Sequence, residues 1–246
     1  MVKKRPRVIS LVPSWTETLL AADVLVVGRT RFCIHPDEAI KNIPSVGGTK
    51  SIDLVKIQKL NPDFVILDRQ ENTAEIAAQL SGQNTQLLVT DVVSFESLQE
   101  SLKYLALQLQ APILEELVMR YARVLPQIDQ KKFLSQLSQN LGSVPDIQGR
   151  RVDYVIWKNP YMVIGANTFI SENLKLIGIE SRHPQKYPQI ADEELKKSFC
   201  LFSSEPFPFA KHYDELLKLG YQGLVIDGEK LSWFGIRNLN FLESSV

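Results

Sequence analysis

Short apolar runs alternate with amphipathic stretches over the first part of the chain, up to residue 91. Apolar and β-branched residues bounded by turn residues are typical of buried strands, whereas apolar positions three or four apart are typical of helices. The predicted strands are 7–12, 25–28, 63–68 and 86–91, and the predicted helices are 14–22, 53–60 and 72–80. Because strand and helix alternate strictly, the pattern predicts a parallel sheet with crossover helices.

Local residues indicate where some of these helices begin and end. Ser14 and Thr16 are candidate caps of the first helix, and Glu17 stands three residues after Ser14, as in a capping box. Asn61-Pro62 should end the second helix, because the residue before a proline is disfavoured in helical geometry.

The middle of the chain, from Ser94 to Asn140, has helical periodicity and no strand pattern. Pro112 and Pro126 should begin new helices or kink one, because proline lacks the backbone N–H of a helix interior. This stretch is too long for a crossover within one small sheet, so it predicts a helical connection between two lobes. The apolar positions that carry the pattern include Phe95, Leu98, Leu102, Leu105, Leu109, Leu117 and Tyr121.

Alternation of strand and helix returns in the last third of the chain. The predicted strands are 151–157, 199–202 and 222–227, and the predicted helices are 168–177, 209–219 and 232–242. The predicted fold class is therefore α/β, with two lobes of mainly parallel sheet joined by a long helical backbone. The predicted division is an N-terminal lobe at 1–93, the helical backbone at 94–145 and a C-terminal lobe at 146–246.

Composition narrows the class of protein. The 246 residues carry 28 basic and 28 acidic side chains, which argues against a nucleic-acid partner because phosphate-binding domains have a basic excess. No stretch of the sequence is apolar enough for a membrane span, and no leader follows the basic start, so the sequence as it stands predicts a cytoplasmic protein, or a periplasmic one if a leader has been removed. Cys33 and Cys200 form no metal-binding spacing, and the three histidines have no helical i,i+4 pair.

Candidate ligand-binding residues cluster after the predicted strands, where open α/β sheets bind their ligands. All three tryptophans lie in or close behind these segments, and aromatic loops suit a flat, partly apolar ligand held between two lobes. His35 is also the candidate metal ligand, through its imidazole. The candidates are Trp15, Phe32, Cys33, His35, Trp157, Asn159, Tyr161, Glu205, Phe207, Glu229 and Trp233.

Each candidate also fits a purely structural role. Trp15 fits the core, and strand-end aromatics such as Phe32 and Trp157 often close the end of a sheet. The loop 206–209 fits a stiff segment packed on its own lobe, Glu205 and Glu229 fit solvated or capping positions, and a lone loop histidine is usually only hydrogen-bonded.

Sequence motifs give no support for catalysis. Gly47–Ser51 departs from the order of a phosphate loop, and the sequence has no GxGxxG, GxSxG or HExxH motif. We therefore expect no catalytic residues, no enzyme activity and no intrinsic cofactor.

Several segments resemble a known family. Residues 7–18 (RVISLVPSWTET), 27–28 (VG), 44–49 (PSVGGT) and 60–67 (LNPDFVIL) are similar to the start of class III substrate-binding proteins, the helical-backbone receptors of importers for cobalamin, ferric siderophores and haem. Residues 32–36 (FCIHP), 157–161 (WKNPY) and 227–233 (DGEKLSW) resemble a cobalamin-binding-like subgroup.

The resemblance implies two α/β lobes joined by one rigid helix, with a metal-bearing small molecule in the cleft between them and an ABC-type permease as partner. It places Phe32 and 157–161 beside the ligand. Val55 and Lys56 occupy the stretch where exported cobalamin binders carry a surface Glu that docks on the permease.

Three hypotheses follow. The favoured one is a monomeric, non-catalytic receptor for a corrinoid, or next for a ferric siderophore or haem. The second is an intracellular enzyme or chaperone of metal or tetrapyrrole handling, centred on Cys33 and His35. The third is an interaction module with a degenerate cleft.

Overall fold

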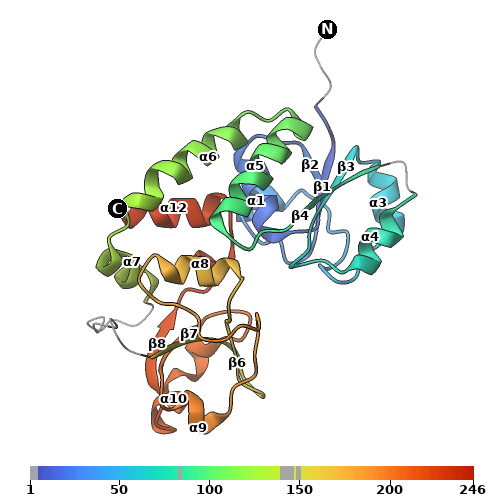
Figure 1. The fold of residues 1–246 in the computed structure, drawn as a ribbon. Coiled ribbons are helices and arrows are strands. Elements are labelled where there is room, and N and C mark those ends of the chain that lie inside the picture. Colours follow the sequence, from blue (N-terminus) through green and yellow to red (C-terminus); the bar gives the residue numbers. More distant parts are fainter. Residues whose placement is uncertain (1–4, 83–84, 139–146, 148–150) are drawn as a thin grey trace. The chain divides into compact units, whose positions relative to one another are not determined.

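The chain folds into two compact units. The computed structural model describes residues 5–82, 85–138, 147 and 151–246 (Figure 1). The first unit comprises Met1–Ala122 and Trp233–Leu239, and the second comprises Arg123–Ser232 and Asn240–Val246. In the described part of the chain, no helix has the length and apolar character needed to cross a bilayer.

A four-stranded parallel sheet forms the centre of the first unit, as the alternating pattern predicts. Its strands are β1 (Val8–Ser10), β2 (Val26–Arg29), β3 (Phe64–Asp68) and β4 (Gln86–Thr90), in the order β2-β1-β3-β4. Its helices are α1 (Pro13–Ala21), α2 (Asp37–Ile40), α3 (Leu54–Leu60), α4 (Ala74–Leu80), α5 (Phe95–Leu109) and most of α6 (Ile113–Val124). Ile9, Val65 and Leu67 on the strands form a buried cluster with Ile57 of α3 and Ile76 of α4. Burying each such side chain contributes about 1.5–3 kcal/mol, so this cluster fixes α3 and α4 on the sheet.

The first helix begins differently from the prediction. Val12 is its N-cap and makes no capping bond through its side chain, while Pro13 occupies the first turn. The predicted capping box of Ser14 and Glu17 is therefore wrong, because Ser14 already lies inside the helix. Proline fits the first turn since its missing N–H would have no helical acceptor there.

The central stretch consists of separate helices. α5 ends at Leu109, α6 starts directly after Pro112, and a single 3₁₀ turn, η1 (Leu125–Gln127), contains Pro126. The two prolines thus break the helix as predicted, but the long backbone is not one helix. The units also differ from the predicted division, because α5 belongs to the first unit and α7 (Gln130–Leu137) to the second. The predicted boundary at residue 145 lies outside the described residues.

The second unit contains another four-stranded sheet. Its strands are β5 (Val152–Trp157), β6 (Met162–Val163), β7 (Phe199–Ser203) and β8 (Gln222–Ile226), in the order β6-β5-β7-β8. The strands β5, β7 and β8 are parallel and were predicted, whereas the two-residue β6 pairs antiparallel with β5 and is too short for its pattern to be recognised. Besides α7, its helices are α8 (Phe169–Lys175), α9 (Asp192–Leu195), η2 (Phe209–His212), α10 (Tyr213–Lys218), α11 (Glu229–Ser232) and the end of α12 (Ile236–Ser244).

Residues 233–239 return to the first unit and dock on α1 and α6. The Tyr121 hydroxyl donates to the Gly235 carbonyl at 2.7 Å, and the backbone N–H of Ile236 donates to Thr18 Oγ1 at 3.0 Å. The guanidinium of Arg237 bonds both carboxylate oxygens of Glu17, at 2.8 and 3.0 Å. The predicted helix 232–242 is therefore interrupted at Gly235, where the backbone turns with a φ of +82°.

Replacing Gly235 with alanine should destabilise the first unit strongly. A Cβ at this position would lie 2.0 Å from Thr18 Oγ1, and the left-handed backbone adds strain. We expect a loss of about 2–5 kcal/mol in the free energy of unfolding, from about 1–2 for the left-handed conformation and about 1–3 for overpacking, measured by urea denaturation. Gly82→Ala is the matched control, because Gly82 also has a positive φ of +89° but no described atom lies within 4 Å of its added Cβ. An equal loss in both variants would contradict this account of the docking contact.

Candidate functional site

Phe32 and Arg31 form an exposed platform at the carboxyl edge of the first sheet, in the loop after β2. The Phe32 side chain is 47% exposed, which is unusual for a large apolar residue. The Arg31 guanidinium carbon lies 4.9 Å from the centroid of the Phe32 ring, a cation–π distance. Gly48 lies against both, because a Cβ there would lie 3.2 Å from Phe32 Cε2 and 3.3 Å from Arg31 Nη2. Because Gly48 has no side chain, the turn at Gly47-Gly48 leaves room for the side chains of Phe32 and Arg31.

His35 and Trp233 lie side by side in the first unit, although they are far apart in the sequence. Their ring centroids are 5.3 Å apart at 67°, an edge-to-face contact. The Arg237 guanidinium carbon lies 5.2 Å from the Trp233 ring centroid, and Asp37 Oδ1 lies 3.6 Å from His35 Nδ1. The returning segment thus brings Trp233 to the loop that carries Phe32. Trp233 itself is 8% exposed, so it mainly supports His35.

Trp15 and Cys33 are fully buried beneath this edge. The indole N–H of Trp15 donates to Thr90 Oγ1 at 2.9 Å, and the Trp15 ring meets Phe234 edge-on at 4.9 Å. The Thr16 hydroxyl donates to Cys33 Sγ at 3.0 Å, and burial raises the pKa of the Cys33 thiol. Neither side chain has surface to offer a ligand here, and for Trp15 the structure agrees with the core role that the sequence left open.

Asn72 ties the ends of two strands to the glycine turn and was missed in the sequence. Its amide donates to the carbonyls of Leu11 and Thr49, at 3.3 and 2.9 Å, and its Oδ1 accepts from the backbone N–H of Asp68 at 2.9 Å. Asp68 is buried, which raises the pKa of its carboxyl group. The sequence predicted Asn72 only as the start of a helix, and nothing in that pattern indicates these contacts.

An aromatic row forms the carboxyl edge of the second sheet. Trp157, at the end of β5, is 42% exposed and meets Phe207 at 6.0 Å between centroids. Phe207 in turn contacts Phe209 at 4.6 Å and His212 at 5.3 Å. Because Phe209 is fully buried, the row runs from the surface into the core. Two of the residues that the sequence marked as ligand-binding candidates, Trp157 and Phe207, are therefore in contact with each other.

Two further ligand-binding candidates, Asn159 and Tyr161, lie in the turn after Trp157. Asn159 is exposed and has a positive φ of +63°. Tyr161 is half-buried and packs edge-on against Tyr221 at 5.5 Å. Lys158 fixes the turn through a 2.9 Å bond to Glu215, whose pKa this lysine lowers.

Carboxylates follow β7 and β8. Glu205 is half-buried and accepts a hydrogen bond from the Ser232 hydroxyl, so it already has a structural partner. Burial, together with the nearby charges of Glu205 and Asp227, raises the pKa of the Tyr154 hydroxyl. Glu229 is half-buried in the first turn of α11. Asp227, which follows β8, lies 3.4 Å from the Lys230 ammonium, so its charge is also partnered.

Metal-ligating side chains do not converge at either edge. No group of three or more His, Cys, Asp or Glu residues with metal-site geometry occurs among the described residues. His35 can therefore offer a single imidazole bond to a metal that a bound molecule already carries.

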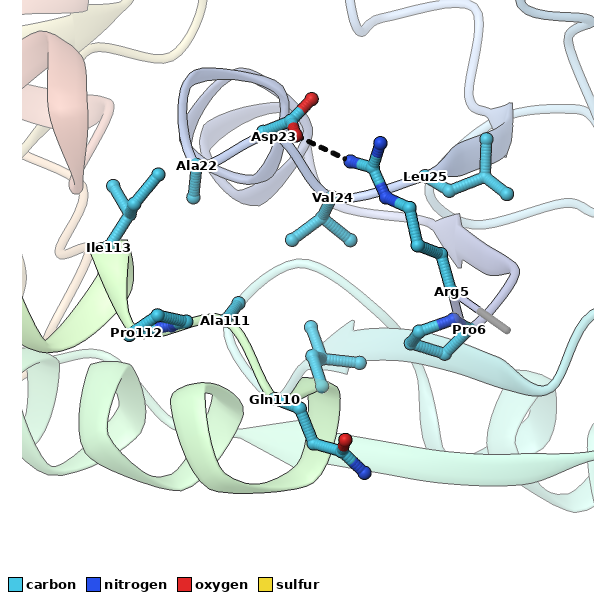
Figure 2. Close-up of a pocket in the computed structure, with 11 residues that line it drawn as sticks. Arg5, Pro6, Ala22, Asp23, Val24, Leu25, Gln110, Ala111, Pro112 and Ile113 are labelled. Atoms are coloured by element: carbon cyan, nitrogen blue, oxygen red, sulfur yellow. Dashed lines mark ion pairs between the residues drawn. The ribbon is translucent and has the colours of Figure 1, made fainter. Parts of the chain in front are cut away.

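Cavities also lie at both edges of the first sheet. Figure 2 shows a mostly apolar cavity of about 290 Å³ at the amino ends of β1 and β2, bordered by a 2.9 Å ion pair of Arg5 and Asp23. A cavity of about 500 Å³ follows β3 and β4 and is lined by Asp68, Arg69 and Ala77.

Comparison with known proteins identifies related sequences. The family model described as periplasmic binding protein matches residues 8–199. A vitamin B12-binding protein of Salmonella paratyphi A (strain ATCC 9150 / SARB42) is 35% identical over 101 residues, which are 41% of this chain and 38% of that protein. The match thus spans well under half of that relative's length.

Solved structures share the fold. The periplasmic vitamin B12-binding protein of Vibrio cholerae has a TM-score of 0.70 at 18% identity, covering 98% of this chain and 94% of that one. A periplasmic haem-binding protein of Roseiflexus sp. RS-1 has a TM-score of 0.76 at 19% identity, covering 97% and 95%. At these identities the likeness establishes the two-lobe α/β fold.

Both cysteines should resist thiol reagents in the native protein. Burial raises the pKa of the Cys33 thiol and raises that of Cys200 to about 12, so the reactive thiolate is scarce at neutral pH and is shielded from reagent. We expect Ellman's reagent to label neither cysteine at pH 7.5 in minutes, and to label both at once in denaturant. Rapid labelling of native Cys33 would contradict its placement.

Proposed function

Because this chain belongs to the periplasmic binding protein family, we propose that it is a receptor for a metal-bearing small molecule, with cobalamin or another corrinoid as ligand. A ferric siderophore or haem is the next candidate. One observation carries the proposal: each sheet presents an exposed aromatic side chain at its carboxyl edge, Phe32 in the first unit and Trp157 in the second. We propose that the ligand contacts both residues.

The size of the ligand face supports this choice. A corrin or porphyrin ring offers an extended apolar surface with a polar rim, and burying about 300 Å² of apolar surface is worth roughly 7 kcal/mol before the costs of association. Phe32 and Trp157 supply apolar contacts, while Arg31 and Asn159 are exposed polar groups beside them. Such a site binds its ligand without any catalytic group.

The metal of the ligand has one candidate partner in this chain. The imidazole of His35 lies in the same loop as Phe32 and is held edge-on by Trp233. We propose that His35 donates an axial bond to the ligand's metal. In that case His35→Ala should shift the visible absorption bands of bound hydroxocobalamin, and unchanged bands would remove His35 from the site.

Delivery to an ABC importer is the proposed role of the complex, and the periplasm its proposed compartment, as the family description suggests. The surface of α3 carries the exposed Val55 and Lys56. Exported cobalamin binders carry a surface Glu in this stretch, which docks on the permease. Because Val55 and Lys56 stand there in this chain, we propose that recognition by a permease uses other charged residues.

The enzyme or chaperone hypothesis centred on Cys33 and His35 gains no support from the structure. A nucleophilic or metal-binding cysteine needs a thiolate, and burial raises the pKa of Cys33. The related families and folds are those of binding proteins.

Binding of hydroxocobalamin tests the proposed function. The purified protein, mixed with hydroxocobalamin and desalted, should carry corrinoid absorbance at about one equivalent per chain. Phe32→Ala and Trp157→Ala should each weaken the affinity by tens-fold, since losing about 100 Å² of apolar contact costs about 2.5 kcal/mol.

Tyr104→Ala is the matched control, because Tyr104 is an exposed aromatic residue in the second half of α5 and not in a loop that follows a strand. It should bind like the unaltered protein. Failure to bind hydroxocobalamin, haem or a ferric hydroxamate at micromolar concentration would refute the proposed function.

A further inference from the structure

We propose that Asn72 is a positioning residue of the proposed receptor site in the first unit. Asn72 holds the turn at residues 47–51 in place, and this turn supports the side chains of Phe32 and Arg31. Asn72 thus acts on ligand binding through Phe32 and not by touching the ligand. This role rests on the proposed function, because it requires that the ligand contacts Phe32.

Two reciprocal hydrogen bonds anchor Asn72 to the end of β3. Its backbone N–H donates to the Asp68 carbonyl at 2.8 Å, and its Oδ1 accepts from the Asp68 backbone N–H at 2.9 Å. Asp68 is itself fixed, because its buried carboxyl group accepts from the Thr90 hydroxyl at 2.6 Å and from the Val92 backbone N–H at 3.1 Å. The Asn72 side chain therefore extends from a well-held base.

The amide nitrogen of the same side chain reaches two other segments. It donates to the Thr49 carbonyl at 2.9 Å and to the carbonyl of Leu11, just after β1, at 3.3 Å. Thr49 lies in the turn at 47–51, which closes on itself through a 2.6 Å bond from the Gly48 N–H to the Ser51 carbonyl. One side chain thus joins the ends of β1 and β3 to the turn.

The turn determines the space beside Phe32. Arg31, the residue before Phe32, donates its backbone N–H to the Gly47 carbonyl at 2.8 Å. The side chains of Phe32 and Arg31 both lie against Gly48, within 3.3 Å of the position that a Cβ would take there. Because the exposed Phe32 ring has this backbone on one side, a displacement of the turn changes the position of the ring.

An asparagine amide suits this role because it donates two hydrogen bonds and accepts others at the same time. Aspartate has nearly the same shape but cannot donate, so Asn72→Asp would place a carboxylate against the carbonyl oxygens of Leu11 and Thr49. A carbonyl that loses its donor is costly. Asn72 also borders the cavity of about 500 Å³ after β3 and β4, and open space on that side cannot replace the lost bonds.

Amide hydrogen exchange measures the turn directly, without any ligand. In Asn72→Asp the backbone amides of Arg31 and Gly48 should exchange about five- to tenfold faster, the factor that corresponds to the net contribution of one hydrogen bond. The amides of β4 should exchange as in the unaltered protein. Asn72→Ala removes the same donor without adding a charge, and it should give the same result.

A double-mutant cycle measures whether Asn72 acts through Phe32. Asn72→Asp should weaken hydroxocobalamin affinity about five- to tenfold in the unaltered background and by the same factor in Trp157→Ala. In Phe32→Ala it should weaken affinity by less than about twofold, because the ring that Asn72 positions is already absent. A purely structural role would give the same factor in all three backgrounds.

Ile76→Val is the matched control for stability. Ile76 is buried in the apolar cluster of the first unit, and this change lowers stability without removing any hydrogen bond of Asn72. It should leave both the hydroxocobalamin affinity and the amide exchange of Arg31 and Gly48 unchanged.

Unchanged exchange at Arg31 and Gly48 in both Asn72 variants would overturn the proposal, as would an equal loss of affinity in the Phe32→Ala and Trp157→Ala backgrounds. Equally weakened binding by Ile76→Val would assign the effect to stability and would overturn it too. If the unaltered protein binds none of hydroxocobalamin, haem and a ferric hydroxamate, the proposed function fails. If it binds and Asn72→Asp binds equally well, the role of Asn72 alone fails.

Discussion

Parallel strand pairing is the constraint on which the rest of this structure depends. In each unit it carries the carboxyl ends of neighbouring strands to one edge of the sheet, so segments distant in the sequence meet there. That edge receives the loop of Phe32 in the first unit and the aromatic row from Trp157 to Phe209 in the second. Phe32 is exposed in the loop that follows β2, and Trp157 is exposed as the last residue of β5.

The edge of the first unit also depends on a segment from late in the sequence, residues 233–239. Residues 233–239 dock on α1 through a bidentate ion pair of Glu17 and Arg237 and through close backbone packing at Gly235. Arg237 touches the Trp233 ring, and Trp233 touches His35. The position of the candidate metal ligand is therefore linked to contacts formed by the end of the chain.

The sequence predicted most of the topology, because hydrophobic periodicity and turn residues are local properties. The predicted strand ends also marked Phe32, Trp157 and Phe207 as candidates. The structure places them at the carboxyl edges of the two sheets, as expected. Trp15, which was also a candidate, lies in the core. The sequence could not decide this, because a tryptophan on a first helix has the same pattern whether it faces the core or a ligand.

The remaining features depend on contacts between distant residues. No local sequence pattern shows that Asn72 links Leu11 and Thr49, or that Gly48 lies against Phe32. The same holds for the interruption of the predicted last helix, where residues 233–239 pack in the first unit. The two-residue β6 and the four-residue α9 each span only about one period of their pattern, so no periodicity can be recognised in the sequence.

Hydrogen–deuterium exchange with and without hydroxocobalamin tests most directly that both carboxyl edges contact one ligand. The account predicts slower amide exchange at 29–36 and at 157–161 together, with no change at 109–113, which lines the cavity at the opposite edge of the first sheet. Protection of only one carboxyl edge, or protection centred on 109–113, would contradict it.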